Sequence, residues 1–323
     1  MNILSAGFVC GDLVLAPVDD LPPVGGNRFV QHAALTIGGC AANAAVGLAR
    51  LLGTAGGRVA LAGRVGDDPL GRLLHESLAE VDVDTGPLLT TPGVATAINT
   101  VLIASNSERS FYVFPGACAH LTPADLPDSL LSQFDHLHLG AIGALPGLAG
   151  AAAADVARRA RGLGLTTSLD ITLNPPRDSA ADVLPLLPYI DLFLPNLSEA
   201  QAVLGPGDVD ALLARGLARG VRLMGLKLGS AGCRLATLAE QASVPAYQVA
   251  AIDTVGAGDA WSAAVIYGWR MGWPLAETGR FANAAGALCT LHPGATAGMA
   301  DVESIQRFVH SQTAGVADHP ASP

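Results

Sequence analysis

Short hydrophobic runs alternate with stretches of helical periodicity along most of the chain. The runs have the length and composition of buried strands, and the stretches place apolar residues at helical spacing. The predicted strands span residues 3–9, 58–62, 136–139, 165–169, 192–194, 223–228 and 244–252. The predicted helices span residues 41–52, 70–78, 148–161, 198–204, 257–271, 275–291 and 302–310. This alternation predicts a doubly wound α/β fold, with a mainly parallel sheet sandwiched by helices.

One region breaks the alternation. Residues 95–114 contain two runs rich in β-forming residues, AINTVLIAS and RSFYVF, separated by the polar turn NSE. This pattern predicts a β-hairpin inserted into the α/β frame. Because the sequence shows no internal repeat, we expect residues 1–311 to form one domain and residues 312–323 to be a disordered tail.

Composition narrows the classes of function. The formal net charge of -10 disfavours a duplex nucleic acid partner, which requires a basic surface. The five cysteines show no CxxC spacing, so neither a disulfide framework nor a zinc site is indicated. The first residues lack a basic leader, and the most apolar later window is interrupted by Pro146. We therefore expect a cytoplasmic protein with no nucleic acid or membrane partner.

The segment with the clearest chemistry is IDTVGAGDAW, residues 252–261, placed between a predicted strand and a long helix. Free N–H groups at Gly256, Ala257 and Gly258 would meet the positive end of the helix dipole, which favours a bound anion. Asp259 in the same turn could take the proton of an attacking hydroxyl. In isolation, such a turn more often just begins a helix.

A second segment, GGCAANAAVGLARLLG at residues 38–53, also begins a helix. The pair Gly38 and Gly39 permits close backbone approach, and Asn43 in the first turn offers both a donor and an acceptor. Asn43 could equally be a simple cap. The GxGxxG dinucleotide pattern fails because Trp261 occupies the third glycine position, and no GxxxxGK[ST] phosphate loop occurs.

Together the two segments resemble the signature motifs of the ribokinase-like (PfkB) carbohydrate kinases, GGxxxNxA and DTxGAGD. Further family-like pieces follow in the expected order: LPPVGG, GRVGDDPLG, PNLSEA, LKLGSAG and FANAAGAL. The resemblance implies transfer of the terminal phosphoryl group of ATP to a sugar-type hydroxyl. It also implies a small β lid at the predicted hairpin, which closes over the acceptor and forms a homodimer contact. Two alternative functions stay open: a nucleoside kinase of the same family, and a ligand-binding protein that kept the fold without catalysis.

The resemblance also assigns roles to residues. It makes Asp259 the general base, with an anion hole of Gly256, Ala257 and Gly258. It places Gly38, Gly39 and Asn43 at the acceptor site. The nucleotide side comprises Asn196, Glu199, Lys227, Gly229, Ser230, Gly232 and Asn283, of which Asn196 and Glu199 are associated with Mg²⁺ through water. The resemblance further implies a site for the monovalent cation K⁺ at Asp253, the carbonyl group of Val255, and Gly294.

One position departs from the family pattern that the resemblance implies. Many of these kinases bind acceptor hydroxyls with an Asp five residues after the first glycine of the opening motif. Counted from Gly11, that position is Ala16. We therefore expect this carboxylate to be missing, with Asp12 as the substrate-binding residue that stands in for it.

The lysine and arginine content bears on the charge of the acceptor. Lys227 is the chain's only lysine, which argues against a phosphorylated acceptor. Arg28, Arg64 and Arg109 could still bind an anion, since guanidinium groups suit phosphate oxygens. On balance the sequence favours a neutral sugar, a polyol or a nucleoside.

Overall fold

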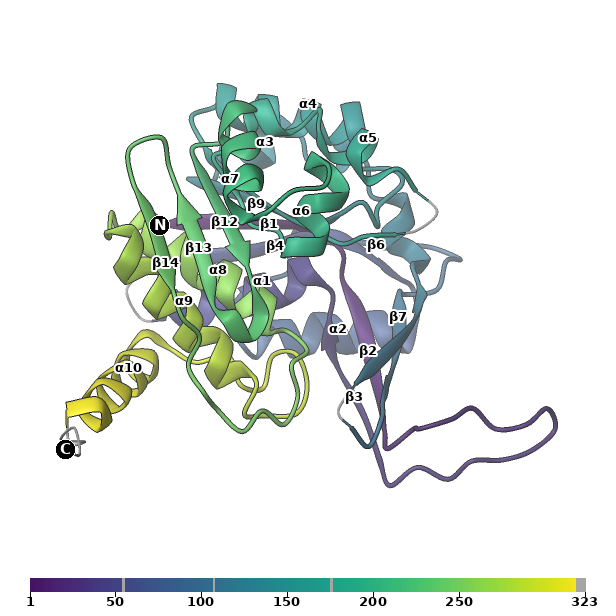
Figure 1. Cartoon of the computed structure of the whole chain (residues 1–323). Coiled ribbons are helices and arrows are strands. Elements are labelled where there is room, and N and C mark those ends of the chain that lie inside the picture. The colour runs from purple at the N-terminus through teal and green to yellow at the C-terminus, as the bar shows by residue number, and fades with distance from the viewer. Residues whose placement is uncertain (54–55, 107, 175–176, 318–323) are drawn as a thin grey trace, which may run out of the picture.

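The computed structural model describes residues 1–53, 56–106, 108–174 and 177–317, which form one large sheet covered by helices and a smaller sheet beside it (Figure 1). The large sheet has the strand order β14-β13-β12-β11-β10-β9-β1-β4-β5, and β6 also pairs with β4. Its strands are β1 (Asn2–Gly7), β4 (Arg58–Gly66), β5 (Val83–Asp84), β6 (Leu88–Thr91), β9 (His136–Ile142), β10 (Thr166–Ile171), β11 (Leu192–Phe193), β12 (Leu223–Lys227), β13 (Cys233–Ala236) and β14 (Gln241–Val244). Only β13 and β14 are added antiparallel. The predicted mainly parallel α/β sandwich is confirmed.

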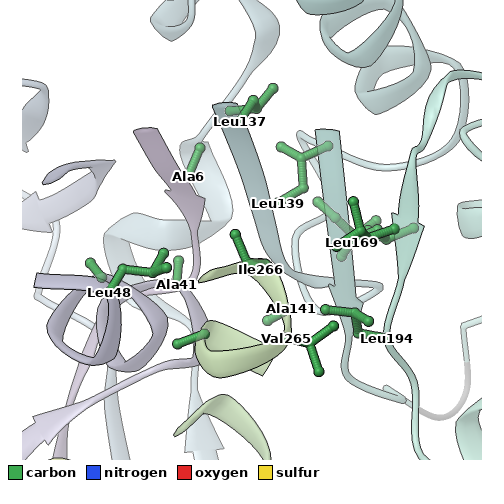
Figure 2. Close-up of a cluster of buried hydrophobic side chains, with 14 of the residues drawn as sticks. Ala6, Ala41, Leu48, Leu137, Leu139, Ala141, Leu169, Leu194, Val265 and Ile266 are labelled. Carbon is green, nitrogen blue, oxygen red and sulfur yellow. The ribbon is translucent and has the colours of Figure 1, made fainter. Parts of the chain in front are cut away.

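Helices cover both faces of this sheet (Figure 1). Their bounds are α1 (Cys40–Leu52), α2 (Pro69–Ala79), α3 (Asp128–Leu131), α4 (Gly150–Gly162), α5 (Ser179–Val183), α6 (Leu197–Leu204), α7 (Val209–Ala218), α8 (Ala257–Arg270), α9 (Leu275–Cys289) and α10 (Val302–Ala317). Helices α1 and α8 pack against each other on one face. In Figure 2, Val265 and Ile266 of α8 lie close to Ala41 of α1 and to Ala141 of β9. Gly47 of α1 faces Ala263 of α8, so the two helices approach each other closely.

The smaller sheet has four strands in the order β3-β2-β7-β8. They are β2 (Cys10–Ala16), β3 (His32–Gly38), β7 (Ile98–Ile103) and β8 (Arg109–Phe114). The predicted hairpin is confirmed as the antiparallel pair β7 and β8, but it supplies only half of the sheet. Strands β2 and β3 were not predicted, because glycine, Asp12 and apolar residues in β2 give no clean two-residue period.

Two sequence expectations near the C-terminus need correction. The strand predicted at residues 244–252 is wrong: β14 ends at Val244, and residues 245–252 form no helix or strand. Pro245 lacks the N–H that would continue the ladder. The tail predicted to be disordered from residue 312 begins inside α10, which continues to Ala317. Its remaining residues, 318–323, lie outside the described residues. In the described part of the chain, no helix combines the length and the hydrophobicity needed to cross a membrane.

Candidate active site

Polar residues gather at the carboxyl ends of the central strands, where ligands bind in open α/β sheets. Asp170 lies near the end of β10 and Lys227 is the last residue of β12. The first turns of α1 and α8 meet at this edge, where Asn43 contacts Asp259. The two sequence motifs, more than 200 residues apart, therefore meet at one site.

The first motif begins α1 with a backbone that needs glycine. Gly39, the N-cap residue, has φ 91°. A Cβ atom at Gly39 would lie only 2.4 Å from the carbonyl oxygen of Phe8. The close approach sets the direction of α1 and places Asn43 in its first turn. There the Asn43 Nδ2 atom donates a hydrogen bond of 2.8 Å to Asp259 Oδ2.

The second motif begins α8 from a left-handed residue. Gly256 has φ 77°, and a Cβ atom there would lie 2.0 Å from the carbonyl oxygen of Ala295. The turn leaves Asp259 buried beside the helix N-terminus. Burial and, second, the charge of Asp170 raise the pKa of Asp259 to about 7, against the hydrogen bond from Asn43. This carboxyl group can therefore exchange a proton near neutral pH.

The main site residue that the sequence analysis missed is Asp170. Both of its carboxylate oxygens accept from Lys227 Nζ, at 2.9 and 2.8 Å, and Ser262 Oγ donates to Oδ2 at 2.8 Å. Burial alone would lower the pKa of Lys227, but the carboxylates of Asp170 and Glu199 hold it well above its usual range. The sequence carried one signal, a carboxylate directly after the predicted strand 165–169.

This lysine cation lies next to the catalytic turn. A Cβ atom at Gly258 would be 3.6 Å from Lys227 Nζ. The positive charge therefore stands beside the N–H groups that begin α8, where an anion would sit. Lys227 was predicted on the nucleotide side, and the structure places it between that side and the catalytic turn.

A cavity of about 410 Å³ opens beside the same turn. The predicted residues Lys227, Gly229, Ser230, Gly232 and Asn283 line it, together with Ala257 and Gly258. Its far wall comes from the irregular segment of residues 246–251, which the sequence analysis had placed in a strand.

Asn283 contributes to this cavity chiefly by holding its walls. Its Oδ1 accepts from Trp261 Nε1 at 3.0 Å, and its Nδ2 donates to the carbonyl oxygens of Val244 and Pro245. The side chain thus ties α8, α9 and the end of β14 together. The sequence analysis placed Asn283 beside the adenine ring, and these bonds occupy both ends of its amide group.

Asn196 and Glu199 form a capping box at the start of α6. Asn196 Oδ1 accepts from the Glu199 backbone N–H, and Glu199 Oε2 accepts from the Asn196 backbone N–H. Burial raises the pKa of Glu199 to about 7, against the attraction of Lys227. Among the described residues, no three His, Cys, Asp or Glu side chains are grouped to hold a metal ion directly. Contact with a hydrated ion, as predicted, is compatible with this donor set.

The residues of the predicted monovalent cation site come together at one loop crossing. Asp253 Oδ1 accepts from the Val255 N–H, and Oδ2 accepts from the Gly294 N–H, both at 2.9 Å. These bonds orient the loop that leads into Gly256. Oxygen atoms of Asp253 and Val255 are the kind of ligand that an alkali cation takes.

The structure places the predicted substrate-binding residue Asp12 beside the first motif. Asp12 is buried, and a Cβ atom at Gly38 would lie 2.2 Å from its carboxyl group, so Asp12 stands directly over the first motif. Ala16 pairs with His32, four residues further along β2, or about 13 Å away. Counted instead from Gly7, at the end of β1, the fifth residue is Asp12.

Asp12 is held by a neighbour from the predicted hairpin. Asn99 Nδ2 donates to Asp12 Oδ1 at 2.9 Å, and the Cys10 thiol contacts the same oxygen at 3.3 Å. Burial raises the pKa of Asp12 to about 6, although both hydrogen bonds lower it. Asp12 and Asn99 are cross-strand neighbours, so they share the face of the small sheet that looks into the site.

Comparison with known proteins gives matches to the kinase family that the two motifs resemble. The sequence model of the family described as "pfkB family carbohydrate kinase" matches residues 2–301. A fructokinase of Klebsiella pneumoniae is 33% identical, covering 93% of this chain and 98% of the relative. An ATP-dependent ribose-1-phosphate kinase of Halopiger xanaduensis is 31% identical, covering 91% and 94%. The crystal structure of a fructokinase double mutant from Vibrio cholerae O395, with fructose, ADP and potassium ion bound, has a TM-score of 0.77 and 25% identity over 95% of this chain and 98% of that one.

Proposed function

Because the chain belongs to the pfkB family and is therefore an ATP-dependent carbohydrate kinase, we propose that Asp259 is the general base that activates an acceptor hydroxyl. The observation that carries the proposal is the buried Asp259 carboxyl group at the start of α8, fixed by Asn43 and with its pKa raised to about 7. The acceptor oxygen attacks the γ-phosphorus of ATP, its proton passes to Asp259, and the bond to the bridging oxygen breaks to release ADP.

The anion hole formed by Gly256, Ala257 and Gly258 would meet the transferring phosphoryl group. N–H groups at the N-terminus of α8 and the Lys227 cation both favour the negative charge that builds on its oxygens. Because these groups are fixed before the reaction, little reorganisation is needed as that charge develops.

ATP would occupy the cavity beside this turn. The volume of about 410 Å³ and the lining by Gly229, Ser230 and Gly232 support a bound nucleotide, since glycine allows close backbone contacts. In this arrangement Asn283 shapes the adenine end through its bonds to Trp261 and to the end of β14.

Two cations complete the proposal. Mg²⁺ would bind the ATP phosphates and reach Asn196 and Glu199 through water, because both side chains are already engaged in the capping box. K⁺ would bind at Asp253 and the carbonyl group of Val255, next to Gly294, and would order the loop before Gly256. The Vibrio cholerae fructokinase contains potassium ion. These ions would screen the phosphates, while this chain's residues position them.

The small sheet would act as the lid of the site. Its inner face carries Asp12 and Asn99, while Leu35, Tyr112 and Phe114 on the opposite face are about half exposed. An exposed apolar face of this kind favours a second copy of the chain, and we propose a homodimer through it. A cytoplasmic location agrees with five cysteines that are all free thiols.

The experiment that tests the function is an acceptor panel with ATP and Mg²⁺, in K⁺ or in Na⁺, followed by ADP release. The panel contains neutral sugars, polyols, sugar acids, sugar phosphates and nucleosides. Acceptor-dependent ADP release with a sugar-type compound supports the proposal. Turnover of nucleosides alone would make the protein a nucleoside kinase. Normal ATP binding with no turnover would make it a non-catalytic ligand-binding protein.

A further inference from the structure

Arg28, Arg64 and Arg109, the three arginines that could bind an anionic acceptor, differ in the partners of their guanidinium groups. Arg28 pairs with Asp20 on an exposed loop. Arg64 is fully engaged, because it donates to both oxygens of Asp125 and to Thr91. Neither guanidinium is available to a ligand at the site. Arg109 is the remaining candidate.

Arg109 begins β8, and its guanidinium group reaches across to the loop before α8. Its Nη1 atom lies 3.9 Å from Asp253 Oδ1, too far for a hydrogen bond, although the side chain is only 26% exposed. Burial lowers the pKa of Arg109, and Asp253 raises it. Both oxygens of Asp253 already accept from the backbone N–H groups of Val255 and Gly294. The Arg109 guanidinium donates no side-chain hydrogen bond to any described residue, so its N–H groups are available to a ligand in a partly buried place.

The face of the small sheet that looks into the site holds the complementary groups. Thr36, Asp12 and Asn99 are neighbours in one row across β3, β2 and β7. The Oγ1 atom of Thr36, the Oδ1 atom of Asn99 and the Oδ1 atom of Asn43 are buried and have no hydrogen-bond partner within the described structure. The amide nitrogens of the two asparagines hold Asp12 and Asp259, which leaves these oxygens free to accept hydroxyl protons.

The three free oxygens and the Arg109 guanidinium would bind different parts of one ligand. Hydroxyl groups satisfy the three free oxygens, and each unpaired buried polar atom is costly to leave unmet. A guanidinium group is satisfied best by two oxygens of an anion, in a paired fork. A neutral sugar would donate to the oxygens but would leave the guanidinium with only its 3.9 Å ion pair to Asp253. Alternation along β8 puts Arg109 on the same face of the small sheet as Phe111 and Val113, and hence as Asn99, which pairs with Val113.

Resting on the proposed kinase function, we propose that the acceptor is a polyhydroxylated small molecule with an anionic group, a carboxylate or a phosphate ester, bound by Arg109. Its hydroxyls donate to Thr36, Asn43 and Asn99, and one of them is phosphorylated by the chemistry given above. The anionic group stays unchanged in the reaction. This inference reverses the preference for a neutral acceptor that the sequence suggested.

The test compares matched acceptors in the wild type and in Arg109→Gln. The pairs are D-fructose with D-fructose 6-phosphate, D-ribose with ribose 1-phosphate, and D-glucose with D-gluconate, so the phosphate and carboxylate arms are separate. Arg28→Gln is the control, since Arg28 lies in the loop that joins two strands of the small sheet, outside the site. ATP binding is measured in all three proteins by calorimetry.

The expected result is a kcat/KM at least about 10-fold higher for the charged member of one arm. Arg109→Gln should lower that value about 10- to 100-fold, as for lost charge-assisted hydrogen bonds, and should leave the neutral acceptor, ATP binding and the Arg28→Gln control nearly unchanged. Preferred turnover of neutral acceptors, or an equal loss for both members of a pair, would overturn this inference and leave the kinase proposal intact. Absence of turnover with every acceptor, despite ATP binding, would overturn both.

Discussion

Lys227 and Asp170 form a buried ion pair at the carboxyl ends of β12 and β10, with Nζ 2.9 and 2.8 Å from the two carboxylate oxygens. It involves the only lysine of a chain whose formal net charge is -10. The pair fixes one cation beside the turn that begins α8. Because Asp259 lies within the field of both groups, the pair affects both the position of the cation and the pKa of the proposed base.

Replacing Asp170 should therefore change activity and its pH dependence together. Asp170→Asn removes a negative charge that raises the pKa of Asp259, so the acidic limb of kcat/KM should move to lower pH. The maximal rate should fall about 10- to 100-fold, because Lys227 loses its charged anchor. Asp155→Asn weakens the ion pairs of Asp155 with Arg158 and Arg159 on α4 and should change neither. A lower rate with an unmoved pH profile would show a purely structural role.

The wild-type pH profile follows from the same carboxyl group. Asp259 must be deprotonated to accept the hydroxyl proton, and its pKa is raised to about 7. The value of kcat/KM should thus rise tenfold per pH unit below about pH 7 and level off above it. Asn43→Ala removes a hydrogen bond that lowers this pKa, so the limb should move to higher pH. A flat wild-type profile between pH 5 and pH 8 would contradict the role of Asp259.

The sequence predicted the frame of the molecule well, for a physical reason. Strands buried on both faces read as continuous apolar runs, and the helices between them are long enough to show their period. Elements outside this frame were missed or misplaced because they lack such a signal. Strand β2 mixes glycine and an aspartate with apolar residues, and β14 ends at a proline that the apolar run around it hides.

The sequence predicted those site residues that belong to recognisable motifs. The meeting of Asn43 with Asp259 depends on two helix starts at one sheet edge, which local patterns plus the fold class imply. The pair of Asp170 with Lys227 depends on strand order, which no local pattern contains. Asp12 was predicted as a stand-in from a count that began at Gly11, and the alternative count from Gly7 becomes visible only once β1 is seen to end there.

Asn283 should matter more for stability than its predicted place beside the adenine ring suggests. Asn283→Ala leaves the indole N–H of Trp261 and the carbonyl oxygens of Val244 and Pro245 without this partner. We expect the free energy of unfolding to fall by about 1 to 3 kcal/mol, measured in urea with ATP absent. ATP affinity should weaken as well, because the cavity wall loosens. Weaker ATP binding at unchanged stability would instead indicate direct contact with the nucleotide.

Two buried histidines on β9 should make the fold sensitive to acid. His136 and His138 both hydrogen-bond to Ser168, and burial lowers the pKa of His138 to about 4. Between that pH and about 6.5 the unfolded chain binds a proton that the folded chain excludes. His138 should therefore reduce the free energy of unfolding by about 1.4 kcal/mol for each unit of falling pH in this window.

The check is the pH dependence of urea unfolding in the wild type and in His138→Gln. The difference in free energy between the two proteins should be constant above about pH 6.5. It should shrink or reverse as the pH falls toward 4, because glutamine does not titrate. Parallel curves through the whole window would mean that His138 is protonated in the folded protein.

Asp259→Asn decides whether Asp259 removes the proton from the acceptor hydroxyl. Asparagine keeps the size of the side chain and its bond to Asn43, but it cannot accept the proton. With the best acceptor from the panel, ADP release in Asp259→Asn should fall about 10²- to 10⁴-fold, while ATP affinity and the unfolding midpoint stay close to those of the wild type. ADP release within a fewfold of the wild type would contradict the claim.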